Sequence, residues 1–182
     1  MNPEKYFLAI IPPPPVSDYV NKYRRQYNNK DNINSIPPHI TIYPPFYSLV
    51  SESNLIDRLR NIQTQTSPFR ISFTSVDFFN NGNNVAFFNP DSDSTLFLKK
   101  LYQNTRQLFS GQITDVWPGY PNKPEQFIPH CTIAEKIPDI EFPSIRKDLE
   151  SLSVNQSFNV KSIFLLRKQV KTWLTVSEIN FN

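Results

Sequence analysis

The sequence has a single cysteine, Cys131, and only three glycines, Gly82, Gly111 and Gly119, in 182 residues. One cysteine cannot form an intramolecular disulfide, so the composition fits the reducing environment of a cytoplasmic protein. Dinucleotide-binding and Walker loops need several closely spaced glycines, and these three are far apart. Any bound phosphate must therefore be held by side chains and ordinary backbone amides.

Long apolar runs and strong charge are also missing. No stretch approaches the ~18 apolar residues of a membrane-spanning helix, and the apolar run 6–11 is too short for a signal sequence, so we expect no membrane association. The net charge is +3 and the pI is about 8.9. This mild basicity suits a small nucleotide or an RNA end, but it is too weak for coating DNA or other long nucleic acid. We expect a cytoplasmic monomer.

Histidine is scarce as well, and its placement is the strongest signal in the chain. The only two histidines, His39 and His130, lie half a chain length apart, and both belong to the string Pro-His-x-Thr-Ile. Strand residues two apart point to the same face, so His39 shares a face with Thr41, and His130 with Thr132. A single histidine among apolar residues is more often structural than catalytic. Core packing, however, gives no reason to repeat the pair, so we infer that the chain builds one imidazole-and-hydroxyl unit twice.

These motifs resemble those of the 2H phosphoesterase superfamily, which is named for two His-x-Thr or His-x-Ser motifs and includes 2′-5′ RNA ligases and phosphodiesterases. The sequence is most similar to the bacterial YjcG-like branch, which has Tyr-Arg-x-x-Tyr, then Ile-Pro-Pro-His-x-Thr, then Phe-x-Pro-His-x-Thr. The matching stretches are 23–27, 36–41 and 127–132, and the late segments 165–166 and 173–176 are also similar. The resemblance covers nearly the whole chain. It implies a metal-independent phosphoesterase that works in RNA processing without a cofactor.

The hydrophobic pattern predicts strands and helices in alternation. Besides the two motif strands, the expected strands cover 6–11, 69–79, 85–89, 158–168 and 173–181, and the expected helices cover 17–27, 52–64, 94–109 and 143–152. The first motif strand is expected to stop at Pro44 and Pro45. Loops over 28–35 and 110–126 precede the motifs and are expected to border the site.

Runs of antiparallel strands with helices between them indicate an α+β fold. The resemblance implies a single bilobal domain over 1–182, whose two lobes are related by a pseudo-two-fold axis. Each lobe is expected to be a small, mostly antiparallel sheet with outer helices. The motif strands, at 39–42 and 130–133, are expected to meet at a central cleft.

Cleavage of a phosphodiester requires a base to activate water or a ribose hydroxyl, and an acid to protonate the leaving oxygen. An unperturbed pKa near ~6.5 suits histidine to both roles, so we expect His39 and His130 to be catalytic, with the assignment of base and acid open. Thr41 and Thr132 are expected to donate hydrogen bonds to the phosphate oxygens. Candidate substrates are 2′,3′-cyclic phosphate ends, 2′-5′ linked oligonucleotides and ADP-ribose cyclic phosphate. Hydrolysis and ligation both remain open.

Three further residues are candidate substrate contacts. Tyr43 is expected to share the face of the first motif, although core packing accounts for it equally well. Lys136 is expected to share the face of the second motif, and Arg167 to face the cleft from the end of a late strand. Many family members have Arg or Gln soon after the second motif, where this chain has Glu135 and Lys136. The phosphate-binding cation is therefore unassigned.

Three alternatives remain. A zinc enzyme usually supplies three protein ligands, and no carboxylate lies at a typical motif spacing from the histidines. A module that binds a nucleotide or RNA end without turnover would use the same residues. A Cys131 nucleophile would have to face His130, whereas strand alternation points this thiol away, as a small buried hydrophobe.

Overall fold

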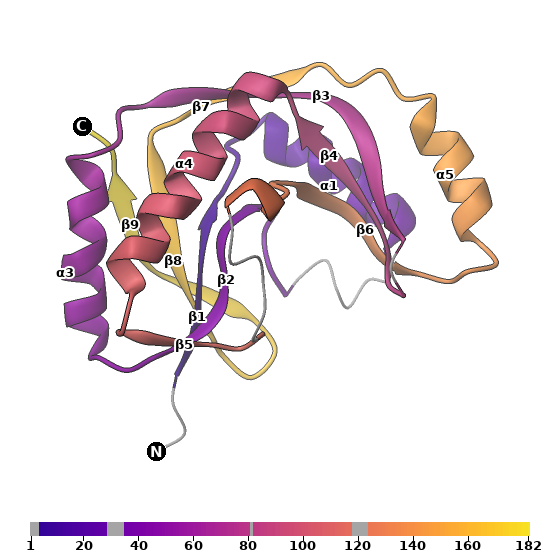
Figure 1. Ribbon diagram of the computed structural model, residues 1–182. Coiled ribbons are helices and arrows are strands. Elements are labelled where there is room, and N and C mark those ends of the chain that lie inside the picture. Colours follow the sequence, from indigo (N-terminus) through magenta and orange to yellow (C-terminus); the bar gives the residue numbers. More distant parts are fainter. Residues whose placement is uncertain (1–3, 29–34, 81, 118–123) are drawn as a thin grey trace.

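A computed structural model describes residues 4–28, 35–80, 82–117 and 124–182 (Figure 1). The described α-helices are α1 (Val16–Tyr27), α3 (Glu52–Gln63), α4 (Ser92–Phe109) and α5 (Phe142–Glu150), with a short 3₁₀ helix, η1 (Pro124–Gln126). The described strands are β1 (Lys5–Ile10), β2 (Ile40–Ser48), β3 (Phe69–Asn80), β4 (Asn84–Pro90), β5 (Ile113–Asp115), β6 (Cys131–Ile137), β7 (Gln156–Val160), β8 (Ser162–Lys168) and β9 (Trp173–Asn180).

These strands join one antiparallel sheet in the order β7-β3-β4-β6-β2-β1-β8-β9, with β5 paired to β2. The two motif strands, β2 and β6, meet in the middle, where Ile40 pairs with Cys131. Each motif strand is the inner strand of one half: β2 leads to β1, β8 and β9, and β6 leads to β4, β3 and β7. The expected α+β fold of two similar, mostly antiparallel halves is confirmed.

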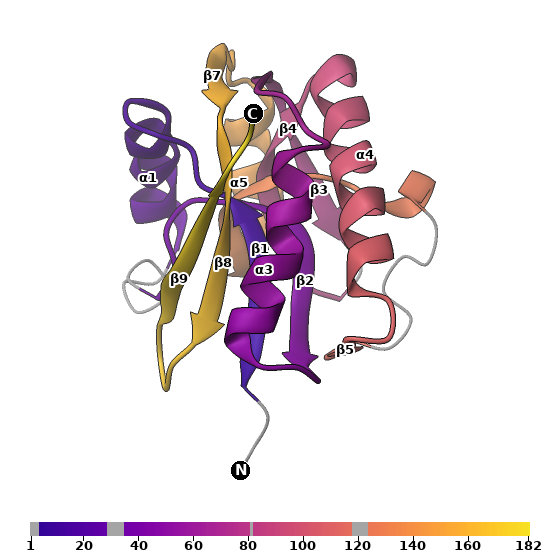
Figure 2. The same ribbon diagram turned by 90° about the vertical axis from the view of Figure 1, so that its left-hand side faces the viewer.

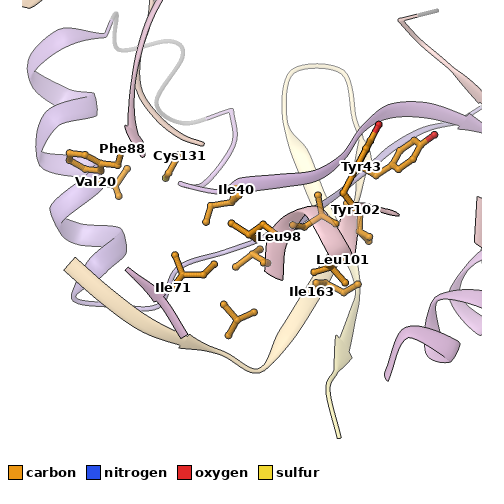
Figure 3. Packing of buried hydrophobic residues seen from close by; sticks show 14 of the residues in the cluster. Val20, Ile40, Tyr43, Ile71, Phe88, Leu98, Leu101, Tyr102, Cys131 and Ile163 are labelled. Atoms are coloured by element: carbon orange, nitrogen blue, oxygen red, sulfur yellow. The ribbon is translucent and has the colours of Figure 1, made fainter. Parts of the chain in front are cut away.

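One hydrophobic core extends along both halves of the sheet (Figure 3). It buries Ile40 and Cys131 of the motif strands completely, and α1 adds Val20 and Tyr23, the latter packing edge-on against Phe88. Along the other half, α4 packs against β2, and α3 packs against α4 and β9, as Figure 2 shows from the side. Because one core serves both halves, we interpret the chain as a single bilobal domain.

Two of the described helices, α3 and α4, start where a side chain satisfies a free backbone N–H group. Ser51 accepts a hydrogen bond from the backbone N–H of Asn54 at the start of α3, and Asp91 accepts one from Ser94 at the start of α4. In α1, apolar residues recur every three or four positions, which turns one face of the helix towards the sheet.

Two strands differ from expectation. β2 continues through Pro44 and Pro45 to Ser48, because the ladder with β1 shifts register between Tyr6 and Leu8, opposite these prolines, so that their missing N–H groups fall in an irregular stretch. The expected strand over 158–168 is two strands: β7 pairs with β3 in one half, and β8 pairs with β1 in the other. No proline or glycine marks this crossing in the sequence.

The expected loop over 110–126 contains β5 and η1. A strand as short as β5 leaves too few residues for an alternating pattern to be recognised. The parts of the two expected loops at 29–34 and 118–123 lie outside the described residues.

Candidate active site

The motif side chains lie on one face of the sheet because neighbouring strand residues point to opposite faces. Ile40 and Cys131, the central pair, are fully buried on the face that the helices cover. The residues that flank this pair project from the opposite face and line one pocket of about 540 Å³: they are His39, Thr41, His130 and Thr132.

Strand pairing also accounts for the sequence repeat. Antiparallel strands are related by a local two-fold axis, and an axis through the central pair relates each residue of the first motif to its counterpart in the second. Extending this antiparallel register by one residue on either side of the pair places His39 across from Thr132, and His130 across from Thr41. Each imidazole is thereby placed beside the hydroxyl residue of the other motif, so the two strings together build one symmetric site.

The two imidazole rings are held in the same way. Nδ1 of His39 donates a hydrogen bond to the carbonyl oxygen of Pro37 at 2.9 Å, and Nδ1 of His130 donates to that of Ile128 at 2.8 Å. A carbonyl only accepts, so Nδ1 carries the proton and Nε2 carries the lone pair of the neutral ring. In each motif a proline stands between that carbonyl and the histidine and fixes φ there, which explains why proline belongs to the repeat.

Both histidines have aromatic neighbours. Phe7 of β1 lies edge-on to His39 at 5.3 Å, and Phe87 of β4 and Phe79 of β3 lie 5.2 Å and 5.0 Å from His130. Burial lowers the pKa of His39 to about 4, and the neighbouring His130 acts in the same direction. Burial also lowers the pKa of His130. Both rings are therefore neutral at pH 7 in the free protein.

Tyr43 is absent from the described residues that line the pocket, and the expectation that it shares the face of the first motif is wrong. Between Thr41 and Tyr43, β2 advances two residues while β1 advances one, so Ile42 forms a β-bulge. The bulge turns Tyr43 into the core, where its ring stacks on Tyr102 and its hydroxyl donates to Asp115 at 3.0 Å.

The second motif strand has a similar irregularity, and the expectation that Lys136 faces the pocket is wrong. The ladder between β6 and β4 shifts register between Thr132 and Ala134, and again before Ile137. Lys136 is exposed and has a φ of 55°, whereas Glu135 lines the pocket. The acidic residue thus takes the place in which a cation was expected.

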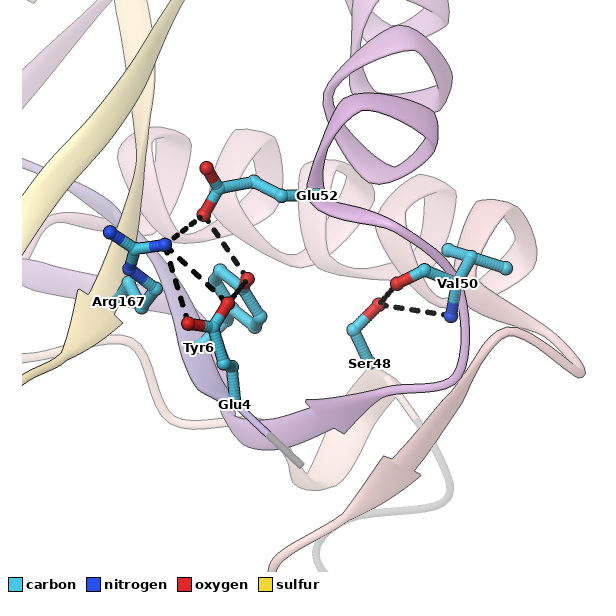
Figure 4. Close-up of polar contacts among 6 residues, drawn as sticks. All are labelled: Glu4, Tyr6, Ser48, Val50, Glu52 and Arg167. Atoms are coloured by element: carbon cyan, nitrogen blue, oxygen red, sulfur yellow. Dashed lines mark hydrogen bonds and ion pairs between the residues drawn. The ribbon is translucent and has the colours of Figure 1, made fainter. Parts of the chain in front are cut away.

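Arg167 faces the opposite side of the sheet (Figure 4), so the expectation that it faces the cleft is wrong as well. It pairs with Tyr6, whose side chain belongs to the main core, and its guanidinium donates to Glu4 at 3.4 Å and to Glu52 at 3.1 Å. The next residue, Lys168, points the other way and lines the pocket. In a strand of period two, an error of one position moves a side chain to the other face.

Several residues of the pocket wall were not assigned from the sequence. Trp173 of β9 packs against Phe7 at 4.6 Å and so joins the wall beside His39. Ser35, Val116 and Trp117 also line the pocket, so the described ends of the two expected loops border it. The remaining unassigned residues that line it include Lys5, Arg24, Asn28 and Glu135. Of these, Arg24 could have been recognised from the sequence as a buried residue, because helical spacing places it on the apolar stripe of α1.

Within the described ranges, no group of three or more His, Cys, Asp or Glu side chains is placed to hold a metal ion. None of the helices that the structure describes is long and apolar enough to cross a membrane.

Cys131 lies behind the site, fully buried, and burial raises the pKa of its thiol to about 12. We expect Cys131→Ala to retain turnover, because the thiol points into the core, and to lower the free energy of unfolding by about 1 kcal/mol, because it leaves a small cavity. Steady-state kinetics and urea unfolding of the variant measure both effects. Loss of turnover in a folded variant would favour a thiol mechanism instead.

Comparison with known proteins places this geometry in a family. Residues 12–172 match the model of the 2′-5′ RNA ligase superfamily. A protein of Geobacillus kaustophilus (strain HTA426) named "Putative phosphoesterase" is 29% identical over 164 residues, which cover 89% of this chain and 87% of that protein.

Solved structures share the fold. The apo form of E. coli LigT has a TM-score of 0.67 and 14% sequence identity, with 100% of this chain and 99% of LigT covered. E. coli LigT complexed with 3′-AMP has a TM-score of 0.63 and 13% identity, with 100% and 99% covered. Because the family model matches most of the sequence, this chain belongs to the 2′-5′ RNA ligase superfamily, as its paired histidine motifs predicted.

Proposed function

We propose that this phosphoesterase of the 2′-5′ RNA ligase superfamily acts on a 2′,3′-cyclic phosphate, a 2′-5′ linked oligonucleotide or a related nucleotide, by metal-independent acid–base catalysis with His39 and His130. The observation that carries the proposal is the single pocket that contains both imidazoles and both motif threonines. LigT has been crystallised with 3′-AMP, which supports a ligand of nucleotide size in a pocket of this kind.

Hydrolysis of a 2′,3′-cyclic phosphate illustrates the chemistry. One imidazole, neutral at Nε2, accepts a proton from water as the water oxygen bonds to phosphorus. The other, protonated at Nε2, donates its proton to the ribose oxygen as the phosphorus–oxygen bond breaks. The product is a phosphomonoester, and proton exchange with solvent restores the two rings. The pKa values of both imidazoles are lowered, so either ring can be the base in this direction.

Other side chains of the pocket suit the charge of the substrate. The hydroxyls of Thr41 and Thr132 are the proposed donors to the non-bridging oxygens, where negative charge increases in the transition state. Lys5 and Lys168 add positive charge to the wall and attract an anionic ligand.

A non-catalytic module that binds nucleotides or RNA ends in the same pocket is the second candidate. One observation favours it: both histidines have lowered pKa values, so the free protein holds little imidazolium at neutral pH. A catalytic site must then acquire its acid when the phosphate binds, because an adjacent anion favours the charged ring.

Turnover of a 2′,3′-cyclic nucleotide in excess EDTA separates the candidates. We expect product release at the same rate with and without EDTA, because the proposed acid and base are side chains. A panel that adds a 2′-5′ linked dinucleotide and ADP-ribose cyclic phosphate identifies the substrate class. EDTA-sensitive turnover would contradict the metal-free mechanism, and binding without product from any compound would support the module.

A further inference from the structure

Two adjacent arginines of α1 have different surroundings. Arg24 and Arg25 follow Tyr23 in the sequence, but only Arg24 falls on the helix face that packs against the sheet. Arg24 is 7% exposed, whereas Arg25 is exposed. Since charged residues are rarely buried without a partner, the position of Arg24 requires an explanation.

Among the described residues, no carboxylate lies within ion-pair distance of Arg24. Nη2 donates to the carbonyl oxygen of Ile36 at 2.9 Å, and Nη1 donates to Oδ1 of Asn21 at 3.4 Å. Both acceptors are neutral, and the ion pairs formed among the described residues do not include Arg24. Burial accordingly lowers the pKa of the guanidinium, which remains charged at neutral pH. A buried charge that has no carboxylate at ion-pair distance is costly, and a bound anion would offset this cost.

The charge of Arg24 is directed at the histidine pocket. Arg24 lines this pocket together with both motifs, and its positive charge contributes to the lowered pKa of His39. One turn later, Asn28 donates to the carbonyl oxygen of Ile133 at 2.7 Å and accepts from the backbone N–H of Glu135 at 2.9 Å. These bonds fix the end of α1 against the second motif strand, so Arg24 is held at a defined place beside the site.

We propose that Arg24 binds the phosphate group of the substrate and supplies the cation that the second motif strand lacks. The inference rests on the proposed function. It explains why Glu135 is tolerated in the pocket, since the charges of Arg24 and Glu135 attract one another in the free protein. A guanidinium is well suited to this role, because its planar donors match two phosphate oxygens at once.

Inorganic phosphate is the probe for this proposal. We expect Arg24→Gln to weaken phosphate binding by at least about tenfold, as measured by NMR titration of the two histidine signals, because a charge-assisted pair is lost. We also expect the pKa of His39 to rise in the phosphate-free variant, since a nearby positive charge is removed. Arg24→Lys is expected to keep the lowered pKa of His39 and to recover part of the affinity. Arg25→Gln, the matched exposed neighbour, is expected to change neither.

Two outcomes would overturn the proposal. One is phosphate binding by Arg24→Gln that is as tight as that of Arg25→Gln, and the other is absence of phosphate binding by the wild type. Should Arg24→Gln fail to fold, the Nε–H signal of Arg24 in the wild-type protein decides: it must shift on addition of phosphate, and an unchanged signal refutes the contact. Turnover by the histidine variants tests the proposed function separately from this inference. If Arg24→Gln keeps its phosphate affinity while the histidine variants are inactive, the role of Arg24 is refuted and the proposed function is not.

Discussion

His39→Ala and His130→Ala should each lower turnover of the substrate by about 10²–10⁴-fold, which is the usual contribution of a positioned acid or base. The double variant should lose far less than the product of the two single losses, because residues that act as one unit are strongly non-additive. Single-turnover measurements on the three variants, under conditions where chemistry limits the rate, give these values.

The control for this prediction is Lys136→Ala, on the same strand as the second motif but exposed and outside the pocket wall that the structure describes. It should keep wild-type turnover. Histidine variants that remain as active as this control would contradict acid–base catalysis by the pair. Losses that multiply in the double variant would show that the two imidazoles act in separate steps or separate sites.

The centre of this candidate site was predictable because the sequence repeats its motif. The family resemblance of the two histidine strings implied a two-fold arrangement, and the antiparallel Ile40–Cys131 pair agrees with it. Strand alternation placed His39 and Thr41 on one face and Cys131 on the other, and each of these placements agrees with the structure. The same alternation failed for Tyr43, because it holds only as far as the first β-bulge.

A second large effect concerns the pH dependence of kcat/KM. Reaction with free protein requires one neutral and one charged imidazole, and the pKa of His39 is about 4 while that of His130 is lowered from 6.5. The singly protonated pair is therefore most abundant on the acid side of pH 6.5. We expect kcat/KM to pass through a maximum there and to fall about tenfold per pH unit above it, as the acid loses its proton.

The dependence of kcat should differ in a defined direction. Bound phosphate is an anion and raises the pKa of an adjacent imidazolium, so the alkaline limb of kcat should lie at higher pH than that of kcat/KM. A pH–rate study from about pH 4 to pH 9 with a cyclic nucleotide provides both curves. A kcat/KM that is constant over this range, or that rises steadily with pH, would contradict the paired roles.

Features that depend on distant parts of the chain could not be predicted. The chain crosses from one half of the sheet to the other between β7 and β8, because β7 pairs with β3 and β8 pairs with β1. The sequence has no local turn signal at Lys161 to mark this crossing. The orientation of Arg167 depends on its register with β1, where it pairs with Tyr6. The position of Arg24 was predictable only in part. Helical spacing places this residue on the buried face of α1, but it does not reveal which pocket the side chain lines.

The central claim is that His39 and His130 contact one phosphate in one pocket. The chain has only these two histidines, so their NMR signals can be followed without interference while a nucleoside 3′-monophosphate is added. The claim predicts that both imidazoles shift together with a single dissociation constant at one ligand per protein, and that both pKa values rise in the complex. A shift of only one imidazole, or two different dissociation constants, would contradict it.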